Sequence, residues 1–378
     1  MSKGKKKNKA QGVIGVIFFM LIGFFCGILM AEYAFSSDEP IMGFIILFVS
    51  MYVTMILQII IHEGGHLIFG LLTGYKFVSF RIGSFTLIRI NNELKFKKLS
   101  LAGTGGQCLL SPPEMKDGKI PYVLYNLGGS ILNTTTAIVF LILGLVFKEI
   151  EILNVVLIMA AIVGFAYALM NGIPLRLGTI DNDGYNTLSM SKDPKALRSL
   201  WIQMKASEMT ANGVRLKDMP EEWFTLPEKE EMKNSMTAVL GVFACNRLMD
   251  ELKFDEAEKL MKEYLNEENA AVGIYKSLMT CDITFCEMIK DIPDTEAIEK
   301  LLDKQQKAFM KSMKNYPSVL RTEYTYQLLI KKDIPTALKL KKQFEKVLKT
   351  HPYTADVESE TELIQIAETK AVMPLNEL

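Results

Sequence analysis

The sequence predicts a mainly helical, polytopic membrane protein with a soluble helical domain at its C-terminal end. Three observations predict it: four long uncharged stretches in the first half, an aromatic and β-branched region between the second and third of them, and a charged, helical second half. The uncharged stretches are residues 10–31, 40–61, 120–147 and 152–175. Each can cross a hydrocarbon core of ~30 Å, which takes roughly 20 helical residues. We therefore expect four transmembrane helices.

The basic residues predict the orientation of these helices. Five lysines precede the first stretch, the connection to the second carries three acidic residues and no basic one, and the 74–119 connection holds eight Lys and Arg. Basic residues accumulate in cytoplasmic loops. We therefore expect a multi-pass protein of the cell membrane with both termini and the 74–119 loop in the cytoplasm. A cleaved signal peptide is the alternative for the first stretch, but that stretch is longer than the roughly 7–15 apolar residues of such a signal.

Three segments are expected. Residues 1–34 form a basic segment and the first helix, residues 40–186 form the membrane core, and residues 192–378 form a cytoplasmic helical domain. Within the core, the composition of residues 77–99 and the turn at Asn91-Asn92-Glu93 predict a small β-hairpin at the membrane surface. The glycines and prolines between residues 103 and 113 predict a loop before the third helix.

The C-terminal domain carries two segments that are similar to the second helix of a tetratricopeptide repeat, 254–261 and 333–340. Their alanines, Ala257 and Ala337, are 80 residues apart, which is not a multiple of the 34-residue repeat. A degenerate repeat array and an irregular helical bundle both remain open. The domain is the candidate site for a cytoplasmic protein partner. We expect His351, beside Pro352, to be an ordinary surface histidine.

Overall charge adds one exclusion. The 43 basic and 43 acidic residues balance, so nothing in the net charge favours nucleic acid as a partner. The five cysteines are scattered and carry no recognisable metal-binding spacing. We assign them no function.

The pentapeptide His62-Glu63-Gly64-Gly65-His66 matches H-E-x-x-H, in which two histidines one helical turn apart hold zinc beside a glutamate general base. It lies between Ile59–Ile61 and Leu67–Phe69, where polar side chains are costly to bury without partners. Zn²⁺ is therefore the predicted cofactor. Hydrogen bonding between helices, the alternative, does not account for the spacing. Gly64 and Gly65 each cost about 1 kcal/mol in a helix interior, which indicates that a neighbouring helix or an extended substrate approaches closely.

A catalytic zinc site needs a third protein ligand and keeps a further position for water. The fourth apolar stretch ends at Asn171-Gly172-Ile173-Pro174, because proline stops the helix. Asp181 and Asp183 follow, and the predicted topology places this end on the same side of the membrane as the histidines. On the residues alone, either aspartate can be the third ligand.

Three motifs, in this order, resemble those of the site-2 protease family of intramembrane zinc metalloproteases: His62–His66, Gly129-Ser130-Ile131-Leu132-Asn133, and Asn171–Pro174 followed by Asp183-Gly184. The family has H-E-x-x-H, G-P-x-x-N, and N-x-x-P followed by D-G. The resemblance covers roughly residues 40–186. Two departures are Ser130, which replaces the family's proline, and a longer stretch from Pro174 to the Asp-Gly pair.

This resemblance implies His62, His66 and Asp183 as zinc ligands and Glu63 as the catalytic base. It implies that Asn133 and Asn171 contact the substrate backbone or the developing oxyanion. The residues alone leave hydrogen bonds between helices open for both asparagines. Asp181 would then cap the loop or orient a ligating histidine.

The predicted function is hydrolysis of a peptide bond in a membrane-embedded peptide or protein, with zinc and Glu63 activating water. A non-catalytic membrane adaptor that keeps the zinc site is the alternative, and Glu63 argues against it because a structural site needs no base. A transporter is disfavoured, since the sequence shows no matching half-repeats. The apolar stretches exclude a soluble zinc protease.

The predicted topology can be tested by cysteine-accessibility labelling. A membrane-impermeant reagent applied to intact cells should label single cysteines placed at residues 33–39 and none placed in the N-terminal segment, the 74–119 loop or the C-terminal domain. Labelling of the C-terminal domain from outside would overturn the orientation.

Overall fold

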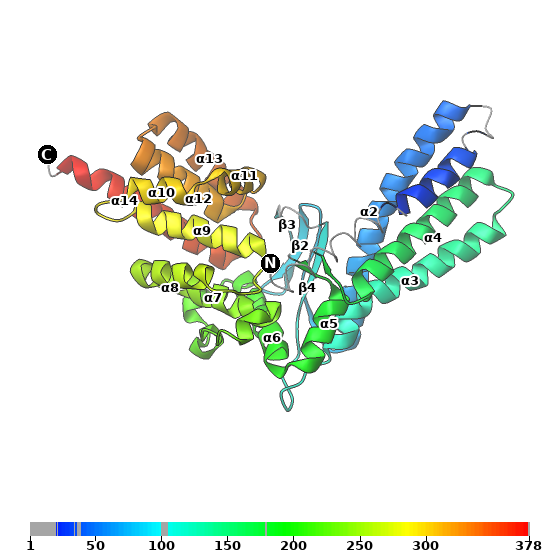
Figure 1. The fold of residues 1–378 in the computed structure, drawn as a ribbon, viewed down its shortest axis with the longest axis horizontal. Helices are drawn as coiled ribbons and strands as arrows, with labels where there is room; N and C mark the ends of the chain where they lie inside the picture. The colour runs from blue at the N-terminus through cyan, green and yellow to red at the C-terminus, as the bar shows by residue number, and fades with distance from the viewer. Residues whose placement is uncertain are drawn as a thin grey trace. The chain divides into compact units, whose positions relative to one another are not determined.

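The computed structural model describes residues 20, 22–33, 35, 39–99, 105–177 and 180–376. They form a mainly helical protein with a four-stranded and a two-stranded sheet, and the chain divides into two compact units. Unit 1 comprises residues up to Phe77 together with Gly105–Pro194, and unit 2 comprises Val78–Thr104 with Lys195–Leu378. The long apolar helices belong to unit 1 and the charged helices to unit 2 (Figure 1).

Unit 1 contains three helices that are long and apolar enough to cross a membrane: α2 (Pro40–Leu72), α3 (Tyr122–Val146) and α4 (Glu151–Gly172). They pack side by side (Figure 1). Three of the four predicted spans are thereby found. Half of the first, residues 10–31, lies outside the described residues, and residues 22–31 belong to a shorter apolar helix, Ile22–Tyr33.

The buried residues of α2 follow one face of the helix, at spacings of three, four or seven residues: Gly43, Leu47, Thr54, Gln58, His62, Gly65, His66 and Gly70. Most of the remaining large apolar side chains of α2 are exposed. An exposed apolar surface of this extent is expected of a helix that faces lipid. The buried face carries the small and polar residues, which is typical of contacts between membrane helices.

Glycines set the distance between α2 and α3. A Cβ atom added at Gly65 would collide with the carbonyl oxygen of Gly128, and one at Gly129 would collide with the His62 ring. Gly64, in contrast, has only Leu132 at 3.9 Å. The close neighbour that the sequence predicts at this glycine pair is therefore α3. It leaves no room for a Cβ atom at Gly65, whereas at Gly64 it is only in ordinary van der Waals contact.

The small sheet has the strand order β3-β2-β1-β4, with β1 (Lys76–Ile82), β2 (Phe85–Ile90), β3 (Glu93–Lys98) and β4 (Gly106–Ser111). β2 is antiparallel to both β1 and β3. Asn91 and Asn92 both have positive φ, as the tight turn between β2 and β3 requires. The predicted hairpin is confirmed as part of this sheet.

The segment after the hairpin differs from the prediction. We expect a loop from residue 103 to Pro113, but Gly106–Ser111 is the strand β4. Strand propensity is a weak guide to this segment. Glycine is disfavoured in strands, but at Gly106 the packing of neighbouring side chains decides the conformation. Residue 103 lies outside the described residues.

Two short strands, β5 (Arg176–Leu177) and β6 (Ile180–Asp181), follow α4, and α5 (Asp183–Lys192) ends unit 1. Unit 2 contains α6 to α14 and four short helical turns. The helices are α6 (Pro194–Ala211), α7 (Ser235–Asp250), α8 (Phe254–Asn266), α9 (Gly273–Met288), α10 (Thr295–Leu301), α11 (Lys304–Ser312), α12 (Pro317–Thr325), α13 (Ile334–Thr350) and α14 (Thr354–Asn376). The turns are η1 (Leu216–Asp218), η2 (Glu221–Phe224), η3 (Glu231–Lys233) and the π-helical η4 (Tyr326–Lys331).

Unit 2 also takes in most of β1 and all of β2 and β3, although the sequence places the hairpin in the membrane core. Within the unit, the Asn91 backbone N–H donates to Asn212 Oδ1 at 3.0 Å, and Lys97 Nζ donates to the Lys349 carbonyl oxygen at 3.4 Å. Contacts between residues so far apart in the sequence cannot be predicted from a local sequence pattern.

The alanines of the two repeat-like segments are buried, Ala257 in α8 and Ala337 in α13. The tetratricopeptide assignment stays a prediction. The surface position expected for His351 is wrong: this side chain is 3% exposed, and its Nε2 lies 3.3 Å from Asp356 Oδ2. The chain folds back at this point from α13 into α14, and that turn buries the ring.

The two motif glycines provide a matched test of the helix contact. We expect Gly65→Ala to lower the free energy of unfolding of the purified protein by about 1–3 kcal/mol or more. The added methyl group would collide with the backbone of α3, which cannot shift without the rest of that helix. Gly64→Ala should be neutral or slightly stabilising, since its Cβ meets only an ordinary contact. Thermal unfolding in detergent measures both, and equal unfolding temperatures would contradict the close approach of α3.

Candidate metal centre

The histidines of the motif occupy the buried face of α2. His62 and His66 are one turn apart and each is 8% exposed. In an α-helix, residues separated by four positions lie one above the other on the same face. Both imidazole rings therefore lie on the buried face of α2, which packs against α3.

Asp183 is the first residue of α5, and the buried side chain of Asn182 fixes its position. Asn182 Oδ1 accepts hydrogen bonds from the backbone N–H groups of Tyr185, at 2.9 Å, and Leu175, at 3.1 Å. Its Nδ2 donates to the carbonyl oxygens of Met170 and Ile173. Asn182 thus caps α5 and ties its start to the end of α4.

Gly184 allows the start of α5 to lie close against the end of α4. A Cβ atom at Gly184 would collide with the carbonyl oxygen of Gly172, the last residue of α4. The Asp-Gly pair therefore combines a carboxylate with the only residue type that fits against the end of α4. This contact directs the Asp183 side chain towards α2.

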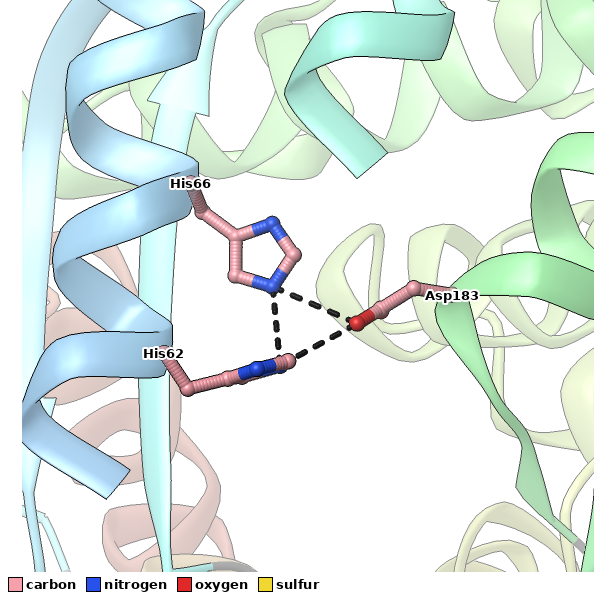
Figure 2. Close-up of side chains that lie close together, drawn as sticks. All are labelled: His62, His66 and Asp183. Carbon is pink, nitrogen blue, oxygen red and sulfur yellow. Dashed lines mark hydrogen bonds and ion pairs between the residues drawn. The ribbon is translucent and has the colours of Figure 1, made fainter. Parts of the chain in front are cut away.

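Three atoms meet at the centre of the site (Figure 2). Asp183 Oδ2 lies 3.1 Å from His62 Nε2 and 3.4 Å from His66 Nε2, and the two Nε2 atoms are 3.2 Å apart. Ligand atoms bound to one tetrahedral zinc at about 2.0–2.1 Å are separated by about 3.3 Å. The three atoms thus have the mutual spacing of three ligands on one tetrahedral ion. Among the described residues, this is the group of His, Cys, Asp and Glu side chains that could hold a metal.

The Nδ1 atoms of both rings also have hydrogen-bond partners. His62 Nδ1 lies 2.8 Å from Asn133 Oδ1, and His66 Nδ1 lies 2.7 Å from the carbonyl oxygen of Tyr125. A carbonyl can only accept, so the Nδ1 of His66 carries the proton and its Nε2 has a free lone pair. Such partners fix both the tautomer and the orientation of a metal-binding histidine.

The orientation of Asn133 gives the same result for His62. Asn133 Nδ2 donates to the Gln58 carbonyl oxygen at 3.1 Å and to Gln58 Oε1 at 2.7 Å, so its Oδ1 faces the ring. Gln58 Nε2 in turn donates to the Ala160 carbonyl oxygen of α4 at 3.1 Å. A chain of hydrogen bonds across all three long helices therefore presents the His62 Nε2 lone pair to the site.

Glu63 lies beside β4. The Cys108 backbone N–H donates to its carboxylate. A Cβ atom at Gly106 would lie only 2.7 Å from the Glu63 Cγ and Oε1 atoms, so glycine provides the room for this carboxylate. Burial and the charge of Glu63 raise the pKa of the Cys108 thiol well above its usual range. The thiol therefore stays protonated and is a poor metal ligand.

The Asp183 carboxylate is ionised. Burial by itself raises its pKa. When the two rings are also protonated at Nε2, as they can be without a bound metal, the charge of His66 and hydrogen bonds from both histidines outweigh burial and hold the pKa of Asp183 well below its usual range. An ionised oxygen and two imidazole nitrogens are a donor set that suits zinc.

The structure brings His62, His66 and Asp183 together and does not include Asp181 in the group. Asp181 lies in β6, opposite Arg176 of β5. Asn133, predicted to contact substrate, is fully buried against His62 and Gln58. Asn171 Nδ2 donates to the Tyr167 carbonyl oxygen at 3.0 Å, within its own helix. Substrate contact by either asparagine stays a prediction.

Sequence reasoning missed the positioning residues Gln58, Gly106 and Asn182. Gln58 carries a signal, because it is an uncharged polar residue one turn before His62 on the same face of an apolar helix. Asn182 carries a weaker one, as an N-cap residue type directly before Asp183. The role of Gly106 has no local signal, since it depends on the packing of β4 beside Glu63.

Comparison of the chain with family models, with curated proteins and with solved structures finds no match.

The two aspartates allow a direct test of the metal centre. We expect Asp183→Asn to lose bound zinc, because it removes the only charged oxygen of the group. Asp181→Asn, two residues away, should keep zinc at the wild-type level. Metal analysis of both purified variants, side by side with the wild type, measures the difference. Zinc loss confined to Asp181→Asn would show that the ligand is the other aspartate.

Proposed function

We propose that this protein is a zinc metalloprotease that hydrolyses a peptide bond of a membrane-embedded or membrane-bound substrate. One observation carries the proposal: the two histidine nitrogens and the Asp183 oxygen have the spacing of zinc ligands, and Glu63 lies on the same turn of a helix long enough to span a membrane. A binding site without catalysis has no use for a glutamate at this position.

The residues present fit a catalytic rather than a structural metal. Three protein ligands leave room for a water molecule, whereas structural zinc sites are closed by four. Zn²⁺ bound there would act as a Lewis acid that makes a water molecule acidic enough to lose its proton near neutral pH. His62 and His66 are already oriented for such an ion by Asn133 and Tyr125.

Glu63 would take the proton from the attacking water and return it to the nitrogen of the leaving amine. The Cys108 N–H holds the carboxylate in place, and Gly106 leaves the space that it occupies. No covalent intermediate with the protein is needed. The protein's part in this mechanism is to position a base and three ligands before substrate arrives.

The resemblance to the site-2 protease family supports the same function. The family's three motifs are present in the same order on α2, α3, and the α4–α5 connection. Ser130, in place of the family's proline, lies within the continuous helix α3 and is buried. By this resemblance, Asn133 and Asn171 would contact the substrate backbone or the developing oxyanion. Asn133 Oδ1 lies 2.8 Å from His62 Nδ1.

A membrane substrate follows from the position of the motif. His62 lies towards the C-terminal end of α2, a helix of 33 residues and therefore about 50 Å long. The reacting peptide bond would lie within the bilayer or at its edge, on the side that the basic loops predict to be cytoplasmic. A spanning substrate helix would have to unwind there, because its peptide groups are otherwise closed by internal hydrogen bonds. The helices of unit 2 would offer the surface for a cytoplasmic partner.

The proposal is tested by Glu63→Gln. We expect cleavage to fall by at least roughly 10²–10⁴-fold, while zinc content and abundance stay near the wild-type level because the ligands are untouched. Mass spectrometry of peptides that accumulate or disappear in cells carrying each form measures cleavage and locates the cut. Glu149→Gln, at an exposed glutamate between α3 and α4, is the matched control.

Two outcomes would contradict the proposal. Wild-type cleavage by Glu63→Gln would exclude Glu63 as the base. Identical peptide profiles in cells with the wild-type protein, Glu63→Gln and Asp183→Asn would favour the non-catalytic adaptor.

A further inference from the structure

Two stacked tyrosine rings lie next to the metal centre in unit 1. Tyr75 follows α2 and Tyr125 lies in the first turn of α3, and their ring centroids are 4.9 Å apart at an interplanar angle of 15°. Gly70 of α2 leaves room for this arrangement. A Cβ atom at Gly70 would lie 3.1 Å from Tyr125 Cδ2 and would collide with the Leu110 side chain of β4. The Tyr125 ring therefore lies where α2, α3 and β4 meet.

The hydroxyl groups of the two tyrosines differ in their hydrogen bonding. Tyr125 Oη donates to the carbonyl oxygen of Cys108, in β4, at 3.1 Å. The Tyr75 hydroxyl is buried and has no hydrogen-bond partner among the described residues. The stacked pair thus contains one hydroxyl that joins two elements of unit 1 and one that joins none.

The backbone of Cys108 connects the Tyr125 hydroxyl to Glu63. The Cys108 carbonyl oxygen accepts from Tyr125, and the Cys108 N–H donates to the Glu63 carboxylate. The N–H and C=O groups of one strand residue point towards the same neighbour. Since β4 is an edge strand of the four-stranded sheet, these groups are free to bond to helices instead of to a further strand. Cys108 therefore joins β4 to α2 and to α3 at once.

The main chain of Tyr125 contacts the metal centre directly. Its carbonyl oxygen accepts from His66 Nδ1 at 2.7 Å, and its ring centroid lies 5.8 Å from that of His66. Tyr125 thus orients a predicted zinc ligand through its carbonyl group. Through its hydroxyl group it holds the strand that binds the predicted base.

We propose that Tyr125 is a positioning residue for the hydrolysis proposed above, on which this inference rests. Its hydroxyl fixes Cys108, and the Cys108 N–H then keeps the Glu63 carboxylate beside the histidines. A general base must lie within hydrogen-bond reach of the water whose proton it takes. Displacement of a catalytic group by about 1 Å can lower the rate by roughly 10²-fold. The Tyr125 hydroxyl therefore affects catalysis without contact to substrate or metal.

Hydrogen exchange of the full chain in detergent tests the structural part of this inference. Tyr125→Phe removes the hydroxyl and keeps the ring, and Tyr75→Phe makes the same change in the stacked neighbour. We expect the peptide that covers Gly106–Ser111 to exchange roughly threefold to tenfold faster in Tyr125→Phe, because β4 loses a hydrogen bond to α3. Tyr75→Phe should leave this exchange unchanged. The α5 peptide, Asp183–Lys192, should exchange at the wild-type rate in both variants.

Cleavage kinetics test the catalytic part, on the substrate that the Glu63→Gln comparison identifies. We expect Tyr125→Phe to lower kcat by roughly tenfold or more, with KM near the wild-type value because the hydroxyl does not contact substrate. Zinc content should be unchanged, since the main-chain carbonyl that holds His66 remains. The unfolding temperature should fall by no more than about 2–4 °C, as the loss of one hydrogen bond implies. Tyr75→Phe should match the wild type in each measurement.

Four results would overturn the inference. Wild-type exchange of β4 in Tyr125→Phe would show that the hydroxyl does not hold the strand, and a wild-type kcat would show that this contact has no catalytic effect. Equal losses in Tyr125→Phe and Tyr75→Phe would assign the effect to the ring pair. Faster exchange of α5 as well would indicate a general loss of stability in place of a local role.

Failure of the proposed function would have a different outcome. The wild-type protein would then show no cleavage, and no kcat could be compared. The exchange of β4 would still decide whether the Tyr125 hydroxyl holds the strand beside Glu63, because that measurement does not depend on catalysis.

Discussion

The backbone contact between α2 and α3 is the constraint on which unit 1 depends. Gly65 and Gly128 leave no space for a Cβ atom between the two helices, and Gly129 leaves none between α3 and the His62 ring. Only at this separation can His62 reach Asn133, and His66 reach the carbonyl oxygen of Tyr125. The glycines cost helix propensity, about 1 kcal/mol each. The polar contacts that they permit orient the histidines. The glycines thus lower the stability of each single helix, but they let the two helices pack closely enough to form these contacts.

Buried polar groups give that geometry its direction. In apolar surroundings an amide or imidazole without a hydrogen-bond partner costs free energy. Each of these groups therefore takes the orientation that gives it a partner. Ala160, Gln58, Asn133 and His62 form one such series, and it ends at a nitrogen lone pair. Asn182 plays the corresponding part for Asp183 through four hydrogen bonds, two to carbonyl oxygens at the end of α4 and two from the backbone N–H groups of Leu175 and Tyr185. Two independent supports thus converge on three atoms with the spacing of zinc ligands, and Glu63 is held beside them by a third, β4.

Unit 2 handles buried charge differently. Arg215 and Arg321 are each shared between two carboxylates. In unit 1 the three atoms with the spacing of zinc ligands come from α2 and the start of α5.

The sequence by itself determined what depends on short-range pattern. Apolar length predicted α2, α3 and α4, alternation with an Asn-Asn turn predicted the hairpin, and four-residue spacing put His62 and His66 on one face. Sequence chemistry also limited the third ligand to Asp181 or Asp183. Tertiary structure decided the rest: that β4 replaces a loop, that His351 is buried, that Asp183 is the aspartate beside the histidines, and that Asn133 faces His62. Each of these depends on which distant atom fills the space next to a residue. That is set by the packing of whole helices and strands, which no local pattern encodes.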